Sequence, residues 1–317
     1  MEYKRSPIPY MGNKYKLLKI LIPLFPKESD IFIDAFGGSG TVSMNYQGGG
    51  KTIYNELNPN IVELVKIMVN NKPEDLDKYW KDKVEYYNLP KQSIKANDRI
   101  TRKGYDDRKE NYNKMREDYN NSKERDYRDL FLLSCYSINH LIRFNGESQF
   151  NASSGADAYN DVNFQRVKDM YETFKNVEIK CGSVFDLNFE TLTDKSFVYL
   201  DPPYLNTEAV YNEKRAFGGW DIDCDYKLFD LLEKLNARGV KWGLSNVFVN
   251  RGKENTHLKE WCEKNNWKVY HLDRNYNPFS RGNSDNDEVY ICNYGETIEE
   301  KKQTIKFEQL DFMSLLG

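Results

Sequence analysis

The chain has 317 residues, enough for one large α/β domain with an insertion or for two modest domains. Hydrophobic residues make up 39% and charged residues 30%, so a sizeable core is expected and wholesale disorder is excluded. The formal net charge of −3 argues against a histone-like polycation, although a basic face can exist within a near-neutral total.

No apolar run approaches the roughly 20 residues that span a bilayer, so no membrane association is expected. The N-terminus is basic but lacks the apolar segment of a secretory signal, and we therefore expect a cytoplasmic protein. The five cysteines are scattered singly, without a CxxC pair, so neither a metal site nor a disulfide framework is predicted. The three histidines, His140, His257 and His271, have no ligand spacing and are interpreted as structural or surface residues.

The first part of the chain has the pattern of a parallel sheet. Residues 30–36 are apolar and predict a buried strand that leads into the glycine-rich sequence FGGSG. Residues 51–56 predict a second strand, and a helical pattern follows over 61–68. Alternation of strands and helices around a glycine turn is typical of a doubly wound α/β fold.

The composition changes at about residue 73. Residues 73–128 are rich in charged residues, Asn and Tyr and have few aliphatic residues, which predicts a solvated helical insertion. An apolar helix is expected over 129–144, and the polar stretch 145–161 is expected to form a loop or hairpin. The strand pattern then resumes at residues 177–179, 196–200, 240–244, 267–271 and 288–292.

A glycine-rich turn follows the first predicted strand. Gly37, Gly38 and Gly40 come after Asp34, and such a turn lets the backbone approach a ligand closely. Glu56, at the end of the second strand, is suited to accept hydrogen bonds from ribose hydroxyls. The spacing matches neither GxGxxG nor a Walker motif, so a nicotinamide cofactor or ATP is not favoured. A tight strand-to-helix turn without a ligand is the alternative.

The most specific motif is Asp201-Pro202-Pro203-Tyr204, directly after the apolar run 196–200. Ligands of doubly wound sheets bind beyond the carboxyl ends of the strands, where this tetrapeptide is expected. The prolines fix the backbone and direct carbonyls outward, the aspartate is an acceptor, and the tyrosine offers a flat face. A planar ligand bearing an amino group fits this set. The alternative is a Pro-Pro turn that ends a strand and carries a solvated aspartate.

These motifs resemble, in kind and in order over residues 7–294, those of the Dam-like (alpha group) DNA adenine methyltransferases. The resemblance implies a Rossmann-like class I methyltransferase fold, α/β with a mostly parallel sheet and an inserted helical target-recognition domain. Residues 1–72 and 169–297 would form the catalytic domain and 73–168 the recognition domain, with a hairpin at 143–155 and a C-terminal tail at 298–317.

The resemblance also implies the chemistry. S-adenosylmethionine would donate a methyl group to the amino group of a flipped-out adenine in double-stranded DNA. The cofactor would leave as S-adenosylhomocysteine, and no metal would be needed. The implied catalytic residues are Asp201, Pro202, Pro203 and Tyr204. The implied cofactor-binding residues are Tyr10, Gly12, Lys14, Asp34, Phe36, Gly38, Gly40, Glu56, Ser183, Phe185 and Asp201.

The sequence RFNGESQFN at residues 143–151 is similar to the DNA-reading hairpin of the family. Arg143 is expected to read a guanine, with a surface or phosphate contact as the alternative, and Asn145 and Asn151 are expected to contact phosphates. A GAT-containing site is expected. Full GATC is not, because residues 152–155 read ASSG instead of V-P-[FY]-G, and Ser148 replaces a usual glycine. The DNA-binding residues implied are Arg143, Asn145, Phe150, Asn151 and Arg281.

Other interpretations remain open at this stage. The basic residues within 99–116 either line phosphates or belong to a solvated helix face, and aromatic residues outside the motifs are expected in the core. The tail sequence QLDF at 309–312 loosely resembles a sliding-clamp-binding peptide, but a terminal helix packing Phe307, Leu310, Phe312 and Leu315 is preferred. A cognate restriction endonuclease is a candidate partner. The alternatives in function are a cytosine 4-amino methyltransferase and an inactive DNA-binding partner subunit.

Overall fold

The structure is a computed structural model, and it describes residues 2–94, 102–205, 219–272 and 286–295. The expected contacts of Arg281 and of the tail at 298–317 lie outside these residues.

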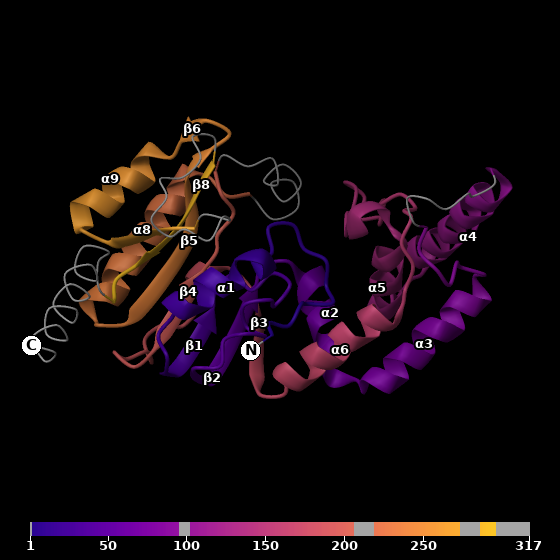
Figure 1. Ribbon diagram of the computed structural model, residues 1–317, viewed down its shortest axis with the longest axis horizontal. Coiled ribbons are helices and arrows are strands. Elements are labelled where there is room, and N and C mark those ends of the chain that lie inside the picture. The colour runs from indigo at the N-terminus through magenta and orange to yellow at the C-terminus, as the bar shows by residue number, and fades with distance from the viewer. Residues whose placement is uncertain (1, 95–101, 206–218, 273–285, 296–317) are drawn as a thin grey trace, which may run out of the picture.

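A single sheet forms the centre of the fold (Figure 1). Its strands are β1 (Ser29–Asp34), β2 (Gly49–Glu56), β3 (Val177–Cys181), β4 (Phe197–Leu200), β5 (Lys241–Asn250), β6 (Lys253–Glu254), β7 (Lys268–His271) and β8 (Asn286–Cys292). The order is β3-β2-β1-β4-β5-β8-β7, with β6 paired to β5. Neighbours are parallel from β3 to β5, and β8 lies antiparallel between β5 and β7. The predicted mostly parallel α/β fold is confirmed.

The strand order reverses between β1 and β4, which lie side by side with Asp34 opposite Tyr199. β4 is buried on both faces, because Phe197 and Tyr199 pack on one side of the sheet and Val198 and Leu200 on the other. A strand covered on both faces reads as a continuous apolar run, which is why this strand was visible in the sequence. The crevice beyond the ends of β1 and β4 is the expected ligand position of such a sheet.

Helices cover the sheet and extend beyond its β3 edge. They are η1 (Tyr15–Leu17), α1 (Leu18–Leu21), η2 (Ile22–Leu24), α2 (Pro59–Asn70), α3 (Pro73–Tyr86), α4 (Arg102–Asn121), α5 (Tyr127–Tyr136), η3 (Ile138–His140), α6 (Asp161–Thr173), η4 (Val184–Asp186), α8 (Ile222–Ala237) and α9 (Thr256–Asn265). Figure 1 shows α8 and α9 beside β5, and α3, α4 and α5 on the opposite side of the molecule, beyond α2 and α6. No helix in the described ranges is long and apolar enough to cross a membrane.

The helices α3 to α6 share one hydrophobic core with the sheet. Tyr54 of β2 and Val65 of α2 belong to the same cluster of buried side chains as Trp80, Tyr112 and Phe131 of α3, α4 and α5. Trp80 is completely buried, and its indole N–H donates to the carbonyl of Arg128 at 2.9 Å. The helical layer is therefore packed onto the sheet through α2 and α6, without a polar boundary in between.

The helix predicted over residues 129–144 is wrong in its second half. α5 ends at Tyr136, and Ser137 pairs with Ser154 in an isolated antiparallel bridge. Asn139 and His140 then have φ angles of 54° and 55°. The extended backbone of Ser137 (φ −82°, ψ 156°) ends the helix, and the left-handed residues keep an α-helix from resuming, so the chain enters the hairpin that was expected after it.

Candidate active site

The glycine turn after β1 is closed by backbone hydrogen bonds and by side-chain packing. The amide of Gly37 donates to the carbonyl of Asn55 at 2.7 Å, which ties the turn to β2. A Cβ atom on Gly37 would lie 2.1 Å from the ring of Tyr54, and Gly38 has a φ of 49°. Glycine is required at residue 37 by close packing and favoured at residue 38 by the backbone conformation.

Glu56 at the end of β2 connects this turn to helix α2. Its Oε2 accepts from the amide of Gly38 at 2.9 Å, and its Oε1 accepts from the amide of Asn58 at 2.8 Å. The side chain is buried. Because each carboxylate oxygen has two lone pairs, Glu56 retains capacity to accept from a ligand hydroxyl at the turn.

Asp34, the last residue of β1, lies in an acidic environment. It is buried, and the Ser43 hydroxyl donates to its Oδ2 at 2.7 Å. Burial raises the pKa of Asp34 to about 7, the negative charges of Asp201 and Glu56 add to the rise, and the Ser43 hydrogen bond opposes it. The carboxyl groups of Asp201 and Glu56 thus lie close enough to Asp34 to influence it electrostatically, which favours a cationic ligand nearby.

An aromatic group lies next to the turn. Phe185, 39% exposed in η4, stacks on Trp220 with ring centroids 6.1 Å apart and an interplanar angle of 14°. Phe36 meets the same indole edge-on at 5.4 Å. Ser183 begins η4 by accepting from the amide of Phe185 at 3.3 Å. The group offers a planar surface suited to a purine.

Trp220 was expected in the core and lies there, 7% exposed, but its contact with the predicted site residue Phe185 was not predicted. It lies before α8, and its indole N–H donates to Asp225 at 2.6 Å. Asp225 is in turn paired with His257 at 2.7 Å. His257 therefore has the structural role expected of it. No local sequence pattern links Trp220 to Phe185, since the two meet only through the fold.

The DPPY tetrapeptide follows β4, and its aspartate is paired with a lysine. Lys14 Nζ lies 2.7 Å from Asp201 Oδ2, and the Tyr204 hydroxyl donates to Asp201 Oδ1 at 3.1 Å. Burial raises the pKa of Asp201, and the charge of Lys14 is the largest opposing effect. Pro202 is buried and Pro203 is partly exposed. The carboxylate is thus fixed by two partners at the carboxyl end of the strand.

Lys14 is the centre of this network. Its ammonium lies 3.8 Å from Glu288 of β8 and 5.1 Å from the centre of the Tyr204 ring. The N-terminal segment that carries it also brings Tyr10 against the glycine turn, because a Cβ on Gly38 would lie 3.0 Å from the Tyr10 ring. Gly12 between them has a φ of 81°. The segment therefore joins the glycine turn to the DPPY motif.

The expected hairpin lies in the helical layer, away from this edge of the sheet. Phe144 pairs with Phe150, and Asn145 Oδ1 accepts from the amides of Glu147 and Gln149 at 3.0 and 2.9 Å. Ser148, at the position where relatives usually have glycine, has a φ of 58°. The Asn145 side chain thus forms the turn, and a left-handed residue is needed at position 148.

Arg143 is exposed and is held by a neighbour on the hairpin. Its Nε donates to Asn151 Oδ1 at 2.8 Å, and a terminal nitrogen donates to the Asn151 carbonyl at 3.1 Å. Phe150, also expected to bind DNA, has a side chain only 1% exposed and packs against Phe144 and Tyr119. Of these residues, Arg143 is the one that the hairpin presents to solvent.

Two arginines of α4 hold the hairpin backbone, a role that was not expected, whereas Lys109 and Lys114 are exposed, as expected of a solvated helix face. Arg116 and Tyr112 donate to the Ala152 carbonyl at 3.2 and 3.0 Å. Arg108 is buried and donates to the Gly155 carbonyl at 2.9 Å. Asn120 donates to the carbonyl and accepts from the amide of Phe150, at 2.9 and 2.8 Å. Side chains of α4 thus support the backbone of the hairpin through hydrogen bonds.

The fold and the motifs at its working edge define a Rossmann-like methyltransferase. The D12 class N6 adenine-specific DNA methyltransferase family matches residues 10–277, and the chain belongs to this family, as the resemblance of its motifs predicted. The family implies use of S-adenosylmethionine.

Individual relatives agree with this assignment. The chain is 32% identical over 305 residues to modification methylase StsI of Streptococcus sanguinis, and 33% identical over 301 residues to type II methyltransferase M.FokI of Planomicrobium okeanokoites. Each alignment covers 92% of this chain but 43% of the relative, so the chain spans less than half the length of these curated relatives. Type II methyltransferase M.MjaIII of Methanocaldococcus jannaschii is 27% identical over 259 residues, which cover 76% of this chain and 83% of the relative.

Proposed function

We propose that this chain transfers a methyl group from S-adenosylmethionine to the exocyclic amino group of an adenine in duplex DNA. The observation that carries the proposal is the Asp201 carboxylate, held by Lys14 and Tyr204 at the end of β4, next to the acidic glycine turn. Family membership gives the reaction class, and the geometry supports the roles proposed for the residues.

The residues beside β1 and β2 fit the cofactor. S-adenosylmethionine supplies a methyl group on a positively charged sulfur. The carboxyl groups of Asp34, Glu56 and Asp201 influence one another electrostatically, so they favour a cation in their midst. Glu56 would accept from the ribose hydroxyls, and Phe185 with Trp220 would stack on the adenine ring.

Asp201 and the Pro202 carbonyl act as acceptors for the two hydrogens of the target amino group. Accepting both hydrogens draws the nitrogen lone pair out of conjugation with the ring and directs it toward the methyl group. Lys14 favours the ionised form of Asp201, which is the form that can only accept. Positioning and electrostatics supply most of the acceleration, and no strong base is required.

The target base must leave the duplex to reach Asp201, so we propose base flipping with stacking on Tyr204. The hairpin at residues 143–155 then reads the site, and Arg143 contacts a guanine of a GAT-containing sequence. This assigns residues 73–168 to target recognition and residues 1–72 and 169–297 to catalysis. Relatives named as modification methylases and type II methyltransferases support a role beside a cognate restriction endonuclease.

The test uses the purified chain, labelled S-adenosylmethionine and duplex DNA, followed by nucleoside analysis. We expect N6-methyladenine from the wild type, none from Asp201→Ala, and cofactor affinity within tenfold, about 1.4 kcal/mol, in that variant. Methylcytosine as the product would support the cytosine alternative, and DNA binding without methyl transfer would support the inactive subunit. An Asp201→Ala rate close to that of the wild type would exclude the proposed mechanism.

A further inference from the structure

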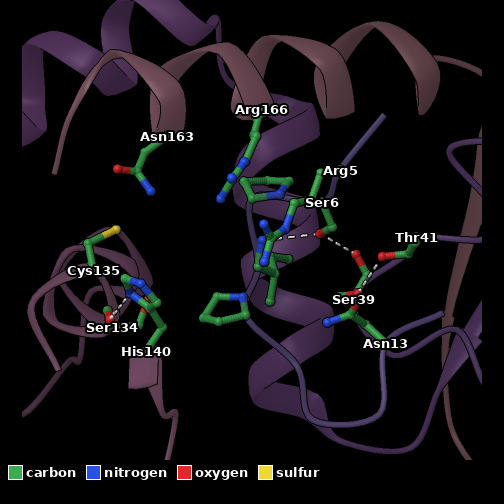
Figure 2. Close-up of a pocket in the computed structure, with 13 residues that line it drawn as sticks. Arg5, Ser6, Asn13, Ser39, Thr41, Ser134, Cys135, His140, Asn163 and Arg166 are labelled. Atoms are coloured by element: carbon green, nitrogen blue, oxygen red, sulfur yellow. Dashed lines mark hydrogen bonds between the residues drawn. The ribbon is translucent and has the colours of Figure 1, made fainter. Parts of the chain in front are cut away.

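A cavity lies where the helical layer meets the catalytic part, and none of the roles assigned above uses it. Its walls come from the N-terminal segment, from the turn after β1, from the end of α5 and from α6. Figure 2 shows Asn163 and Arg166 extending from α6 into this space, with Arg5 on one side and His140 on the other.

The cavity carries positive charge without a matching acid. Arg5 and Arg166 both line it, and its lining contains neither aspartate nor glutamate. Burial lowers the pKa of Arg166, and the charge of Arg5 lowers it further, so the two cations repel each other. Among the described residues, neither guanidinium has an ion pair or a hydrogen bond; Arg5 is exposed and lies over the Tyr15 ring, 5.6 Å from its centre.

Other arginines of the chain are used differently. Arg128 is paired with Asp126 at 2.6 Å, and Arg238 donates to three backbone carbonyls. The unused donors of Arg5 and Arg166 therefore point to a ligand that is anionic and oxygen-rich. The lining adds the amides of Asn13 and Asn163, which can donate to the same oxygens.

The position of the cavity indicates which anion it binds. Asn13 on its wall precedes Lys14, the partner of Asp201, and His140 on the opposite wall lies three residues before Arg143. The cavity is thus lined by segments that lead directly to the methyl-transfer residues and to the hairpin. His140 was expected to be a structural or surface residue. Its Nε2 lies 3.2 Å from Asp157 Oδ2, and its backbone is left-handed, with a φ of 55°.

We propose that Arg5 and Arg166 bind one phosphodiester of the DNA backbone between the flipped base and the bases read by the hairpin. The inference rests on the proposed function, since it requires duplex DNA as the substrate. Guanidinium groups are well suited to phosphate because their donors match its oxygens in pairs. Such a contact fixes the register of the duplex and carries no sequence information itself.

The first experiment measures DNA affinity as a function of salt for the wild type, Arg5→Gln, Arg166→Gln and the double variant. Losing one phosphate contact lowers the slope of log K against log salt by about 0.9, so raising salt from 50 to 200 mM should weaken the wild type about 3.5-fold more than the double variant. Arg166→Lys, which keeps the charge, should retain most of the slope. Lys234→Gln is the matched control, because it removes one positive charge from an exposed residue of α8 that does not line the cavity.

The second experiment replaces single phosphates of the duplex with neutral methylphosphonates. The wild type should lose affinity at one position, and the double variant should be insensitive at that same position. S-adenosylmethionine affinity and the order of preference among duplexes should be unchanged in both arginine variants.

Three outcomes would overturn the inference while leaving the proposed function intact. They are a salt slope of the double variant equal to that of the wild type, a double variant that still loses affinity at every methylphosphonate position as the wild type does, or a changed sequence preference in the arginine variants. Binding of inorganic phosphate that depends on both arginines, with DNA affinity unaffected, would assign the cavity to a free anion instead. Failure of the wild type to methylate any DNA would remove the proposed function itself, which is a separate result.

Discussion

At the scale of single residues, Lys14 is the centre of the network at the end of β4, because its ammonium group lies near Asp201, the Tyr204 ring and Glu288 of β8. It is buried and lies within 4 Å of both Asp201 and Glu288. The charge of this buried cation favours the ionised form of Asp201, against the effect of burial. The sequence indicated Lys14 through its resemblance to a cofactor segment, but its pairing with Asp201 required the fold.

Replacing Lys14 by Met should shift the pH dependence of methylation. Burial raises the pKa of Asp201, and the charge of Lys14 is the largest effect that lowers it. Without the ammonium group the pKa rises, so Asp201 stays protonated to higher pH. The acidic limb of the kcat profile should therefore move to higher pH. The profile of Lys14→Arg should stay near that of the wild type, and an unmoved limb in Lys14→Met would show that Asp201 does not control it.

Asp34 should make stability depend on pH in an identifiable direction. Its pKa in the folded protein is about 7, above its usual value, so the folded state binds the proton more tightly than the unfolded state. Stability therefore falls as pH rises from about 4 to 7, by up to about 1.4 kcal/mol per pH unit from this residue.

Asp34→Asn should remove that part of the pH dependence, measured as the free energy of unfolding by denaturant at several pH values. Asp194→Asn, which changes an exposed aspartate, is the charge-matched control. Equal slopes for the wild type and Asp34→Asn would contradict the assignment.

At the scale of elements, the geometry of the hairpin at residues 143–155 changes the role expected for Asn151. Asn151 was expected to contact phosphate, but here its side chain and carbonyl hold the Arg143 guanidinium. A residue that orients the base reader should influence the same base pair as the reader itself.

Arg143→Ala should relax methylation at one base-pair position of the mapped site, since a bidentate contact discriminates by about 1–3 kcal/mol. Asn151→Ala should relax the same position more weakly. The measurement is the methylation rate on duplexes that each carry one base-pair change. A uniform loss with the preference order intact would make Arg143 a backbone contact instead.

Asn120→Ala should act on the hairpin as a whole. The variant loses both hydrogen bonds to the Phe150 backbone, so the strand that follows the turn is less firmly held. Amide exchange at residues 144–151 should become faster, and rates on all duplexes should fall together with the preference order kept. A selective change at one base pair would instead give Asn120 a reading role.

The elements differ in how well the sequence predicts them, and the difference has physical causes. The parallel strands were predicted because burial on both faces produces continuous apolar runs, as in β4. The end of α5 was missed because neither Gly nor Pro marks it, and the helix stops at the extended backbone of Ser137, before left-handed Asn139 and His140. The role of Arg108 was missed because its acceptor, the Gly155 carbonyl, is 47 residues away in the chain.

At the scale of the whole molecule, the shared core predicts a single unfolding transition. Trp80 belongs to the helical layer, yet it lies in the same buried cluster as Tyr54 of the sheet. Trp80→Ala should lower the free energy of unfolding by about 3–5 kcal/mol. Far-ultraviolet circular dichroism and tryptophan fluorescence should still give coincident transitions, and two separated transitions would show that the layers fold independently.

The hydrogen bonds from α4 to the hairpin backbone affect how sequence specificity can be exchanged between relatives. A recombination that moved residues 143–155 alone would separate the hairpin from Asn120, Tyr112, Arg116 and Arg108, whose donors support its backbone. A crossover before α4 would carry the hairpin together with these supports. We therefore expect chimeras that exchange about residues 102–158, rather than residues 143–155 alone, to transfer a recognition sequence intact.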